Sequence, residues 1–473
     1  MEMVKEQVKA WLGPYDGAFR FASATYNSLR FSPIVLRRIL RDAIRQRGGR
    51  PFTPLRQRPL LWRVPLPAVA DADALMALLR RWGIEFFSGL HAIYLPPQEK
   101  LAELFPAVVS SYPKQTGFKI LKDMRPVEEA QYLYGDKNIP IRRWLVGPPQ
   151  EQVVAANLLF GLGIGPRVWD VSTWQGEANA LTVFAVDHVA GVRPSKAQWQ
   201  EFIAALEEAE ANGEIEVALP SWRTASDFEC PDCRGNLIFC PDSRRLMYVD
   251  FQSFAVPDHG EYIGRITERH KDVLHFGKPR PFRGSSYLYQ SLPGTSTGKR
   301  DTDERWRHLT VELGKVGVAF DERLVLDVGC NAGLMLFSAL ATGAKWGLGW
   351  DLPEVAAAAE KLLLALGASR FSITPAVLQR DYDLAADIPT HLAGDVRESV
   401  VLYLSVSRNL GLLPAVARIP WRALVYEGHQ GDDLEASVSS LLIWAGPGVR
   451  VAAEGRRADG ESDRRPFVIL MRE

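Results

Sequence analysis

Residues 324–335, LVLDVGCNAGLM, constrain the fold of this chain more than any other segment. An apolar run ends at Asp327, a turn with Gly329 and Gly333 follows, and a second apolar run begins at once, as in a strand, tight turn and helix. Glycines there let the backbone approach a ligand that a side chain would exclude. The next run, KWGLGWD, ends at Asp351, where a carboxylate accepts hydrogen bonds from ribose hydroxyls. Together these features predict a nucleoside-binding site at the tips of two neighbouring strands.

Strand-like and helix-like runs alternate from Arg323 to the end of the chain. PEVAAAAEKLLLALG is helix-like, whereas VVLYLSV, ALVYEG, VRVAAEG and PFVILMR are strand-like. This alternation predicts an α/β domain with a doubly wound, mostly parallel sheet and an antiparallel end.

The turn reads D-V-G-C-N-A-G, with an acid before the first glycine, whereas nicotinamide-binding domains normally show G-x-G-x-x-G. A carboxylate there suits a ligand with an ammonium group and does not suit phosphates. The segment resembles motif I of class I S-adenosylmethionine-dependent methyltransferases, and residues 306–473 follow that family's Rossmann-like order of elements. The resemblance implies that this turn and the second acid bind S-adenosylmethionine, through Asp327, Gly329, Cys330, Asn331, Gly333 and Asp351. Cys330 is expected to be a packing residue, not a nucleophile.

Methyl transfer needs an acceptor in line with the sulfonium carbon, beside the ends of the first and fourth strands. Polar residues follow the fourth and fifth strands, namely Ser405, Ser407, Arg408, Asn409, Glu427 and His429. His429 either takes a proton from a hydroxyl acceptor or is a solvated loop residue. Gln379 and Asp381, after the third strand, are candidates for contacts to adenine, which stay open.

Residues 111–275 predict a second α/β or α+β domain. Its run CPDCRGNLIFCPDSRRLMYVDFQSF resembles the catalytic segment of aminoglycoside-phosphotransferase-like and protein-kinase-like enzymes. The resemblance implies ATP and Mg²⁺, with Asp232 acting on an acceptor hydroxyl and Asn236 and Asp250 holding metal. It also implies that Glu151 is the helix C glutamate, while Arg142 and Arg143 stand where a lysine is usual. The competing interpretation is a zinc site, for which Cys230, Cys233 and Cys240 supply only part of a ligand set.

Residues 1–110 are rich in arginine, and residues 276–305, dense in Pro, Gly, Ser and charge, are expected to link the kinase-like domain to the methyltransferase domain at 306–473. The arginine-rich region contains an amphipathic helix, SPIVLRRILRDAIRQRGG. This helix either packs on its own domain, for which the N-lobe of the kinase-like domain is one candidate, or lies on an anionic membrane surface.

The stretch YLYQSLPGTSTGKRDTDER before motif I resembles a segment that covers the active site in bacterial bifunctional kinase-methyltransferases of glycan modification. The resemblance implies acceptor contacts from Tyr289, Gln290, Lys299, Arg300 and Arg305, whose cations suit a phosphate or carboxylate. A solvated linker is the alternative.

The sequence therefore predicts an O-methyltransferase for a sugar, glycan end or related polar metabolite, with a kinase-like domain that phosphorylates or binds the acceptor. The alternatives are a pseudokinase-type scaffold and an RNA methyltransferase. The 56 basic and 56 acidic residues balance, which argues against nucleic acid. No apolar run is long enough to span a membrane, and four cysteines fit a reducing compartment, so a cytoplasmic protein is expected, with the inner membrane face as the site of any peripheral contact.

Overall fold

The structure is a computed structural model, and it describes residues 71–84, 92–95, 112–113, 115–123, 149–177, 180–212, 216–217, 237–249, 254–255, 259–274, 288–293, 298–458 and 464–472. The chain forms two compact units. The described residues within Val64–Phe105 and Gln115–Pro257 belong to the first, and those within Pro106–Lys114 and Asp258–Glu473 belong to the second. The arginine-rich helix expected between residues 32 and 49 lies outside the described residues.

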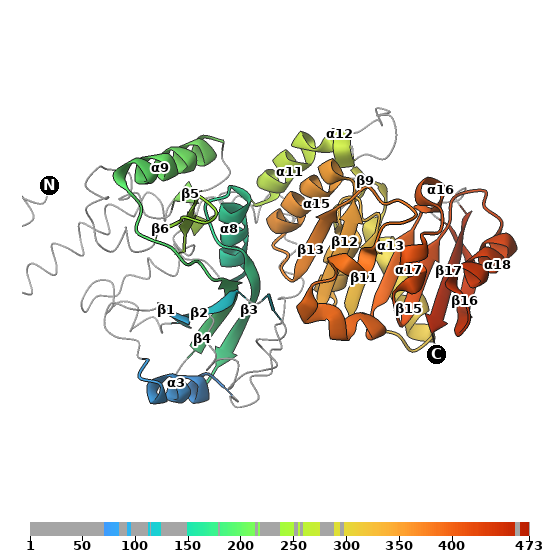
Figure 1. Cartoon of the computed structure of the whole chain (residues 1–473), viewed down its shortest axis with the longest axis horizontal. Helices are drawn as coiled ribbons and strands as arrows, with labels where there is room; N and C mark the ends of the chain where they lie inside the picture. Colours follow the sequence, from blue (N-terminus) through green and yellow to red (C-terminus); the bar gives the residue numbers. More distant parts are fainter. Residues whose placement is uncertain are drawn as a thin grey trace, which may run out of the picture. The chain divides into compact units, whose positions relative to one another are not determined.

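The first unit contains a four-stranded antiparallel sheet in the order β1-β2-β4-β3 (Figure 1). Its strands are β1 (Ala92–Leu95), β2 (Thr116–Asp123), β3 (Val168–Gln175) and β4 (Ala180–Asp187). Helix α8 (Pro149–Gly161) separates β2 from β3 in the chain and packs on β3, with Val154, Ala155 and Leu159 buried. Helix α3 (Ala72–Arg81) contacts β3 and β4 and begins at Asp71, whose carboxylate accepts a bond from the Ala74 N–H.

The remainder of the first unit follows β4 in the sequence. Helix α9 (Lys196–Ala211) begins with a capping box between Ser195 and Gln198. A hairpin of β6 (Leu237–Cys240) and β7 (Arg245–Tyr248) comes next, and the short strands β5 (Glu216–Val217) and β8 (Phe254–Ala255) pair with each other.

The second unit is built on a seven-stranded sheet in the order β13-β12-β11-β14-β15-β17-β16 (Figure 1). The strands are β11 (Leu324–Val328), β12 (Trp346–Asp351), β13 (Phe371–Pro375), β14 (Val400–Leu404), β15 (Ala423–Glu427), β16 (Val449–Ala458) and β17 (Arg464–Arg472). The first five strands are parallel, whereas β17 runs antiparallel to both of its neighbours. This order confirms the predicted α/β fold, a Rossmann-like, doubly wound and mostly parallel sheet with an antiparallel end.

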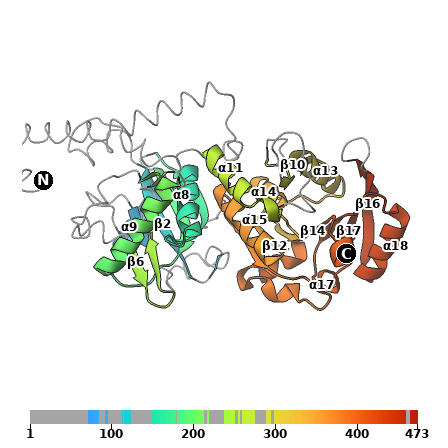
Figure 2. The ribbon, with the colours of Figure 1, turned by 90° about the horizontal axis from the view of Figure 1, so that it is seen from above.

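Both faces of this sheet are covered, which explains why every residue of β11, β14 and β15 is buried. On one face, α13 (Thr302–Lys315) and α14 (Leu334–Ala341) share a core cluster with Val325, Leu402 and Val425. Helix α15 (Pro353–Ala365) packs on β12 and β13. On the other face, the ring of Tyr403 lies 6.2 Å from that of Trp444 in α18 (Leu434–Ala445). Figure 2 shows the same elements from above.

The second unit begins earlier in the chain than the sequence predicted. Helices α11 (His259–Arg269) and α12 (Lys271–Leu274) pack against α15, so they belong to this unit although the kinase-like domain was expected to continue to residue 275. Part of the expected linker is also ordered structure of this unit, because β9 (Leu288–Gln290) and β10 (Gly298–Arg300) pair in parallel. Among the described residues, no helix combines the length and apolar character needed to cross a membrane.

Candidate functional site

The glycine turn after β11 has the geometry that the sequence predicted. Gly329 and Gly333 have φ values of +73° and +72°, which side chains rarely adopt. The N–H groups of Gly329 and Cys330 donate to the Trp350 carbonyl at 2.9 and 3.2 Å and so fasten the turn to β12. A Cβ atom on Gly329 would lie 2.5 Å from Val406 Cγ1. The turn therefore depends on glycine for both its conformation and its close approach to the chain after β14.

Asp351, at the end of β12, points toward this turn. Its Oδ2 accepts the Asn331 N–H at 2.7 Å and its Oδ1 accepts the Leu352 N–H at 2.8 Å. Burial raises the pKa of Asp351, while these two N–H groups act in the opposite direction. Each carboxylate oxygen has a second lone pair, so the side chain can still accept bonds from a ligand.

Asp327 carries a buried carboxylate oxygen that lacks a partner. The residue is 3% exposed, and its Oδ2 makes no hydrogen bond in the described part of the chain. Burial raises the pKa of Asp327 to about 7, with Arg305 lowering it and Asp351 raising it further. The Oδ1 atom of Asn331, in the neighbouring turn, is also buried without a hydrogen-bond partner among the described residues. Two acceptors are thus held at one strand tip, where a donor group of a ligand would satisfy them.

Cys330 occupies space inside the turn. It is 1% exposed, and a Cβ on Gly349 of β12 would lie 2.9 Å from its Sγ. Burial raises the pKa of the Cys330 thiol well above its ordinary value, with Asp327 and Asp351 acting in the same direction. A protonated, enclosed thiol is a packing group and a poor nucleophile.

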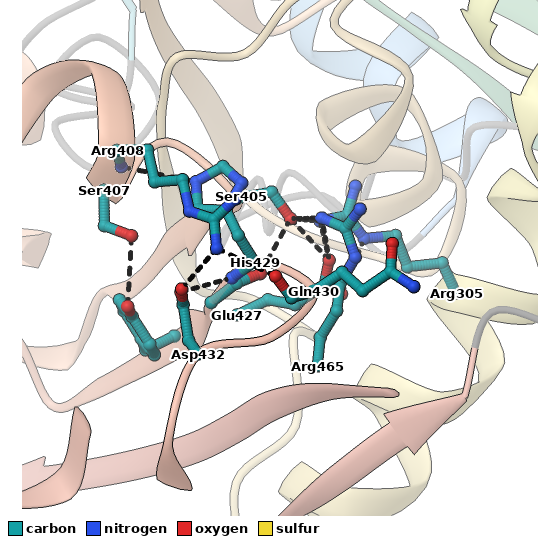
Figure 3. A network of polar contacts seen from close by, with 11 residues as sticks. Arg305, Ser405, Ser407, Arg408, Glu427, His429, Gln430, Asp432 and Arg465 are labelled. Atoms are coloured by element: carbon teal, nitrogen blue, oxygen red, sulfur yellow. Dashed lines mark hydrogen bonds and ion pairs between the residues drawn. The ribbon is translucent and has the colours of Figure 1, made fainter. Parts of the chain in front are cut away.

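A polar network joins the tips of β14 and β15 to the start of α13 (Figure 3). The guanidinium of Arg305 donates to both carboxylate oxygens of Glu427, at 2.9 and 3.1 Å. Ser405 donates to Glu427 Oε1 at 2.6 Å and accepts a bond from Arg465 Nη1 at 2.9 Å. Ser405 itself has a φ of +60°, an unusual conformation for serine. Arg305 and Glu427 were expected to contact an acceptor, and the structure instead places them against each other, almost wholly buried.

His429 and Arg408 lie together on the adjacent rim (Figure 3). The Arg408 N–H donates to His429 Nε2 at 3.3 Å, and the Arg408 guanidinium pairs with Asp432 at 2.7 Å. Burial lowers the pKa of His429, and Arg408 adds to that effect while Asp432 opposes it. The imidazole is therefore neutral near pH 7 and capable of accepting a proton.

Of the residues expected to contact an acceptor in the segment before α13, Arg300 acts on His429. The Arg300 guanidinium lies 5.7 Å from the ring centre of Tyr289 and is one of the charges that lower the pKa of His429. Gln290 is buried, and Lys299 lies on β10. The segment is fixed by Ser291 and Thr302, because Thr302 Oγ1 donates to the Ser291 carbonyl at 2.6 Å.

One contact beside the glycine turn was not predicted from the sequence. Asp387 Oδ2 accepts bonds from Trp350 Nε1 at 2.8 Å and from the Tyr382 hydroxyl at 2.7 Å, which ties the loop after β13 to the end of β12. Gln379 and Asp381, the sequence candidates for adenine contacts, are exposed on that loop.

In the first unit, the predicted polar residues Asp232, Asn236 and Asp250 lie outside the described residues, as do Arg142, Arg143, Cys230 and Cys233. Cys240 is half-buried at the end of β6, and Glu151 lies within α8. No group of three or more metal-ligating side chains occurs in the part of the chain that is described.

Lys119 is a residue of the first unit that the sequence did not single out. It is buried on β2 at 7% exposure, and its Nζ donates to the Val249 carbonyl at 2.9 Å. Val249 directly precedes Asp250. No sequence signal indicated this burial, because Lys119 alternates with Phe118 and Ile120 as a solvent-facing residue would, whereas the structure buries both faces of the strand there.

Comparison with known proteins gives likenesses to part of the chain only. No protein-family profile and no curated protein sequence matches. A structure of the N-terminal domain of EvdMO1 with SAH and D-fucose is 16% identical, covers 44% of this chain and 96% of its own, and has a TM-score of 0.30. Magnesium protoporphyrin IX methyltransferase from Synechocystis PCC 6803 with bound SAH is 15% identical, covers 36% of this chain and 83% of its own, and has a TM-score of 0.25. The strand order of the second unit, and not these partial likenesses, defines the fold.

Proposed function

We propose that the second unit is an S-adenosylmethionine-dependent methyltransferase. The observation that carries this proposal is the buried, unpartnered Oδ2 of Asp327 beside a glycine turn whose amide is held by Asp351. An unsatisfied buried carboxylate is costly for a protein unless a ligand pairs with it. A donor with a positively charged amino group fits that position, and a phosphate does not.

On this proposal, residues at the tips of β11 and β12 bind different parts of S-adenosylmethionine. Asp327 receives the ammonium of the methionine part, with Asn331 Oδ1 as a second acceptor. Asp351 accepts the ribose hydroxyls through its remaining lone pairs. Bound there, S-adenosylmethionine supplies an electrophilic methyl group on a sulfonium. The protein orients this group toward the ends of β11 and β14 and excludes water.

The acceptor is, on this proposal, a sugar or another polar metabolite that meets the rim at His429. Neutral His429 would take the proton of a hydroxyl acceptor on Nε2, in place of the bond from the Arg408 N–H, as the acceptor oxygen bonds the methyl group and the sulfonium S–C bond breaks. Arg300 is one of the positive charges acting on His429, and this charge favours an acceptor that also carries a phosphate or carboxylate, whereas the charge of Arg408 is paired with Asp432.

A second proposal concerns the first unit, which we infer to be kinase-like and to bind ATP with Mg²⁺. Its antiparallel sheet, the helix between β2 and β3, and the buried Lys119, whose Nζ donates to the Val249 carbonyl, support this proposal. Lys119 would meet the nucleotide phosphates, while Asp232, Asn236 and Asp250 would serve the acceptor hydroxyl and the metal.

Calorimetric titration of the full chain with S-adenosylmethionine, and separately with Mg-ATP, tests both proposals. Donor binding is expected to fall at least about tenfold in Asp327→Ala and to be unchanged in Glu454→Gln, an exposed control on β16. Lack of donor binding by the wild-type chain would overturn the methyltransferase. Donor binding without Mg-ATP binding would overturn the kinase-like activity and leave a methyltransferase with a binding module.

A further inference from the structure

Arg305 is buried and hydrogen-bonded within the protein, so its positive charge acts on neighbouring groups of the protein. It lies in the first turn of α13 and is 1% exposed. Two of its nitrogen atoms donate hydrogen bonds to Glu427, which is fully buried. A guanidinium in such a position stays protonated. Burying this ion pair is expensive, and a salt bridge of this kind is weak evidence for stability alone.

The strand registers place Asp327 on the same face of the sheet as Glu427. Asp327 pairs with Leu402, and Glu427 pairs with Leu404, two residues further along β14. Leu402 and Leu404 both pack in the cluster that contains Trp306 and Leu309 of α13. Both carboxylates therefore face the side of the sheet that α13 covers. Arg305 lies in the first turn of this helix.

Several groups act on the ionisation of Asp327. Burial, the strongest influence, and the carboxylate of Asp351 on β12 favour its neutral form, whereas Arg305 favours the carboxylate. The Cys330 thiol in the turn stays protonated, so it adds no charge. Glu427 and Tyr289 both raise the pKa of Arg305, and the negative charge of Glu427 offsets part of its positive charge.

We propose that Arg305, held by Glu427, is a positioning residue of the donor site that keeps the Asp327 carboxylate negatively charged for the ammonium of the methionine part. Neutral Asp327 would hold that ammonium more weakly, because a protonated carboxyl has no negative charge and only part of its acceptor capacity. The inference rests on the proposed function and replaces the expected contact of Arg305 with an acceptor. Glu427 sets the strength of the effect, since it neutralises part of the field of Arg305.

The test uses two variants that move the charge on Asp327 in opposite directions. Glu427→Gln removes the counter-ion of Arg305 and leaves its positive charge, whereas the double variant Arg305→Gln/Glu427→Gln removes both charges of the pair. In both variants Arg465 loses its 3.9 Å ion pair with Glu427 and can keep its bond to Ser405, so the two variants differ only in the charge of Arg305. The dissociation constant of S-adenosylhomocysteine, which keeps the ammonium, is measured by calorimetry between about pH 5 and pH 9. The pH midpoint of binding is expected to fall by about one unit in Glu427→Gln and to rise by about one unit in the double variant.

The control pair is Arg323 and Glu398, whose ion pair of 2.6 Å lies at the other end of β11. Arg323→Gln/Glu398→Gln is expected to leave the midpoint unchanged. If both test variants weakened binding by the same factor at every pH, Arg305 would be a structural residue and the proposal would be overturned. If the double variant does not fold, the downward shift in Glu427→Gln still decides, because an unchanged midpoint there contradicts the proposal.

A second measurement separates this inference from the proposed function. The unfolding temperature of the unliganded chain is followed over the same pH range, where the titration of Asp327 contributes a change in stability. If the wild-type chain binds no S-adenosylhomocysteine, the proposed function fails. Opposite shifts of the stability change in the two variants would still support the coupling of Arg305 to Asp327, and their absence would exclude it.

Discussion

The carboxylate of Asp351 accepts the backbone N–H of Asn331, so the tip of β12 holds the turn that follows β11. Two adjacent strand ends are thereby joined by a charged hydrogen bond of 2.7 Å, and the residue expected to bind ribose also shapes the turn expected to bind the amino acid part. Loss of this side chain is therefore expected to affect both the stability of the protein and the proposed donor site.

Asp351→Ala is expected to lower the free energy of unfolding by about 1–3 kcal/mol, because two N–H groups lose a charged acceptor. Affinity for S-adenosylmethionine should fall by about 10- to 100-fold. Chemical denaturation and calorimetry measure the two effects. Asp351→Asn is the control, since its amide oxygen still accepts one bond, and it should lose less on both counts. Unchanged affinity in Asp351→Ala would show that the donor does not reach this strand tip.

Comparison of Gly329→Ala with Gly448→Ala separates two costs of an added side chain, the strain of a positive φ and a steric clash with a neighbour. The φ of +73° at Gly329 costs a side chain about 1 kcal/mol, and the new methyl group would also meet Val406 at 2.5 Å. Gly448→Ala is the matched control, with a φ of +76° and no atom within 4 Å of the added Cβ. Urea denaturation should show a loss of about 1 kcal/mol for Gly448→Ala and about 3 kcal/mol for Gly329→Ala. Equal losses would mean that Val406 moves aside freely.

Asp327→Asn is expected to change how stability depends on pH. Burial raises the pKa of Asp327 to about 7 in the folded chain, above its ordinary value of 3.8. The stabilisation from this proton is fully present below pH 3.8 and is lost as pH rises through about 7. The unliganded variant should therefore gain stability relative to wild type between these values and keep the gain above pH 7. Unfolding temperatures of both proteins between about pH 5 and pH 8 check this, and parallel curves would refute it.

Lys119→Met tests the role of the first unit. Removing the ammonium that donates to the Val249 carbonyl should weaken Mg-ATP binding at least about tenfold, while the apolar stem keeps most of the packing. Fluorescence titration with Mg-ATP measures this, and Lys196→Met, on the exposed first turn of α9, serves as the control. Equal affinities for the two variants would remove Lys119 from any nucleotide site.

The sequence by itself determined the local features of the second unit. The apolar run that ends at Asp327, the two glycines of the turn and the acid at Asp351 each act within a few residues of the chain, so their pattern predicted the strand, the turn and the doubly wound sheet. The short distances between these residues and the rigid period of a strand made that prediction possible.

Only the tertiary structure decided which distant charges meet. Arg305 and Glu427 are separated by more than a hundred residues and were each expected to contact an acceptor, yet the fold buries them against one another. Lys119 and Val249 are likewise brought together only by the packing of the first unit. The partner of a charged side chain depends on which strand tips lie side by side and on the cost of leaving a charge unpaired away from water. The local sequence determines neither of these, because both depend on how distant segments pack.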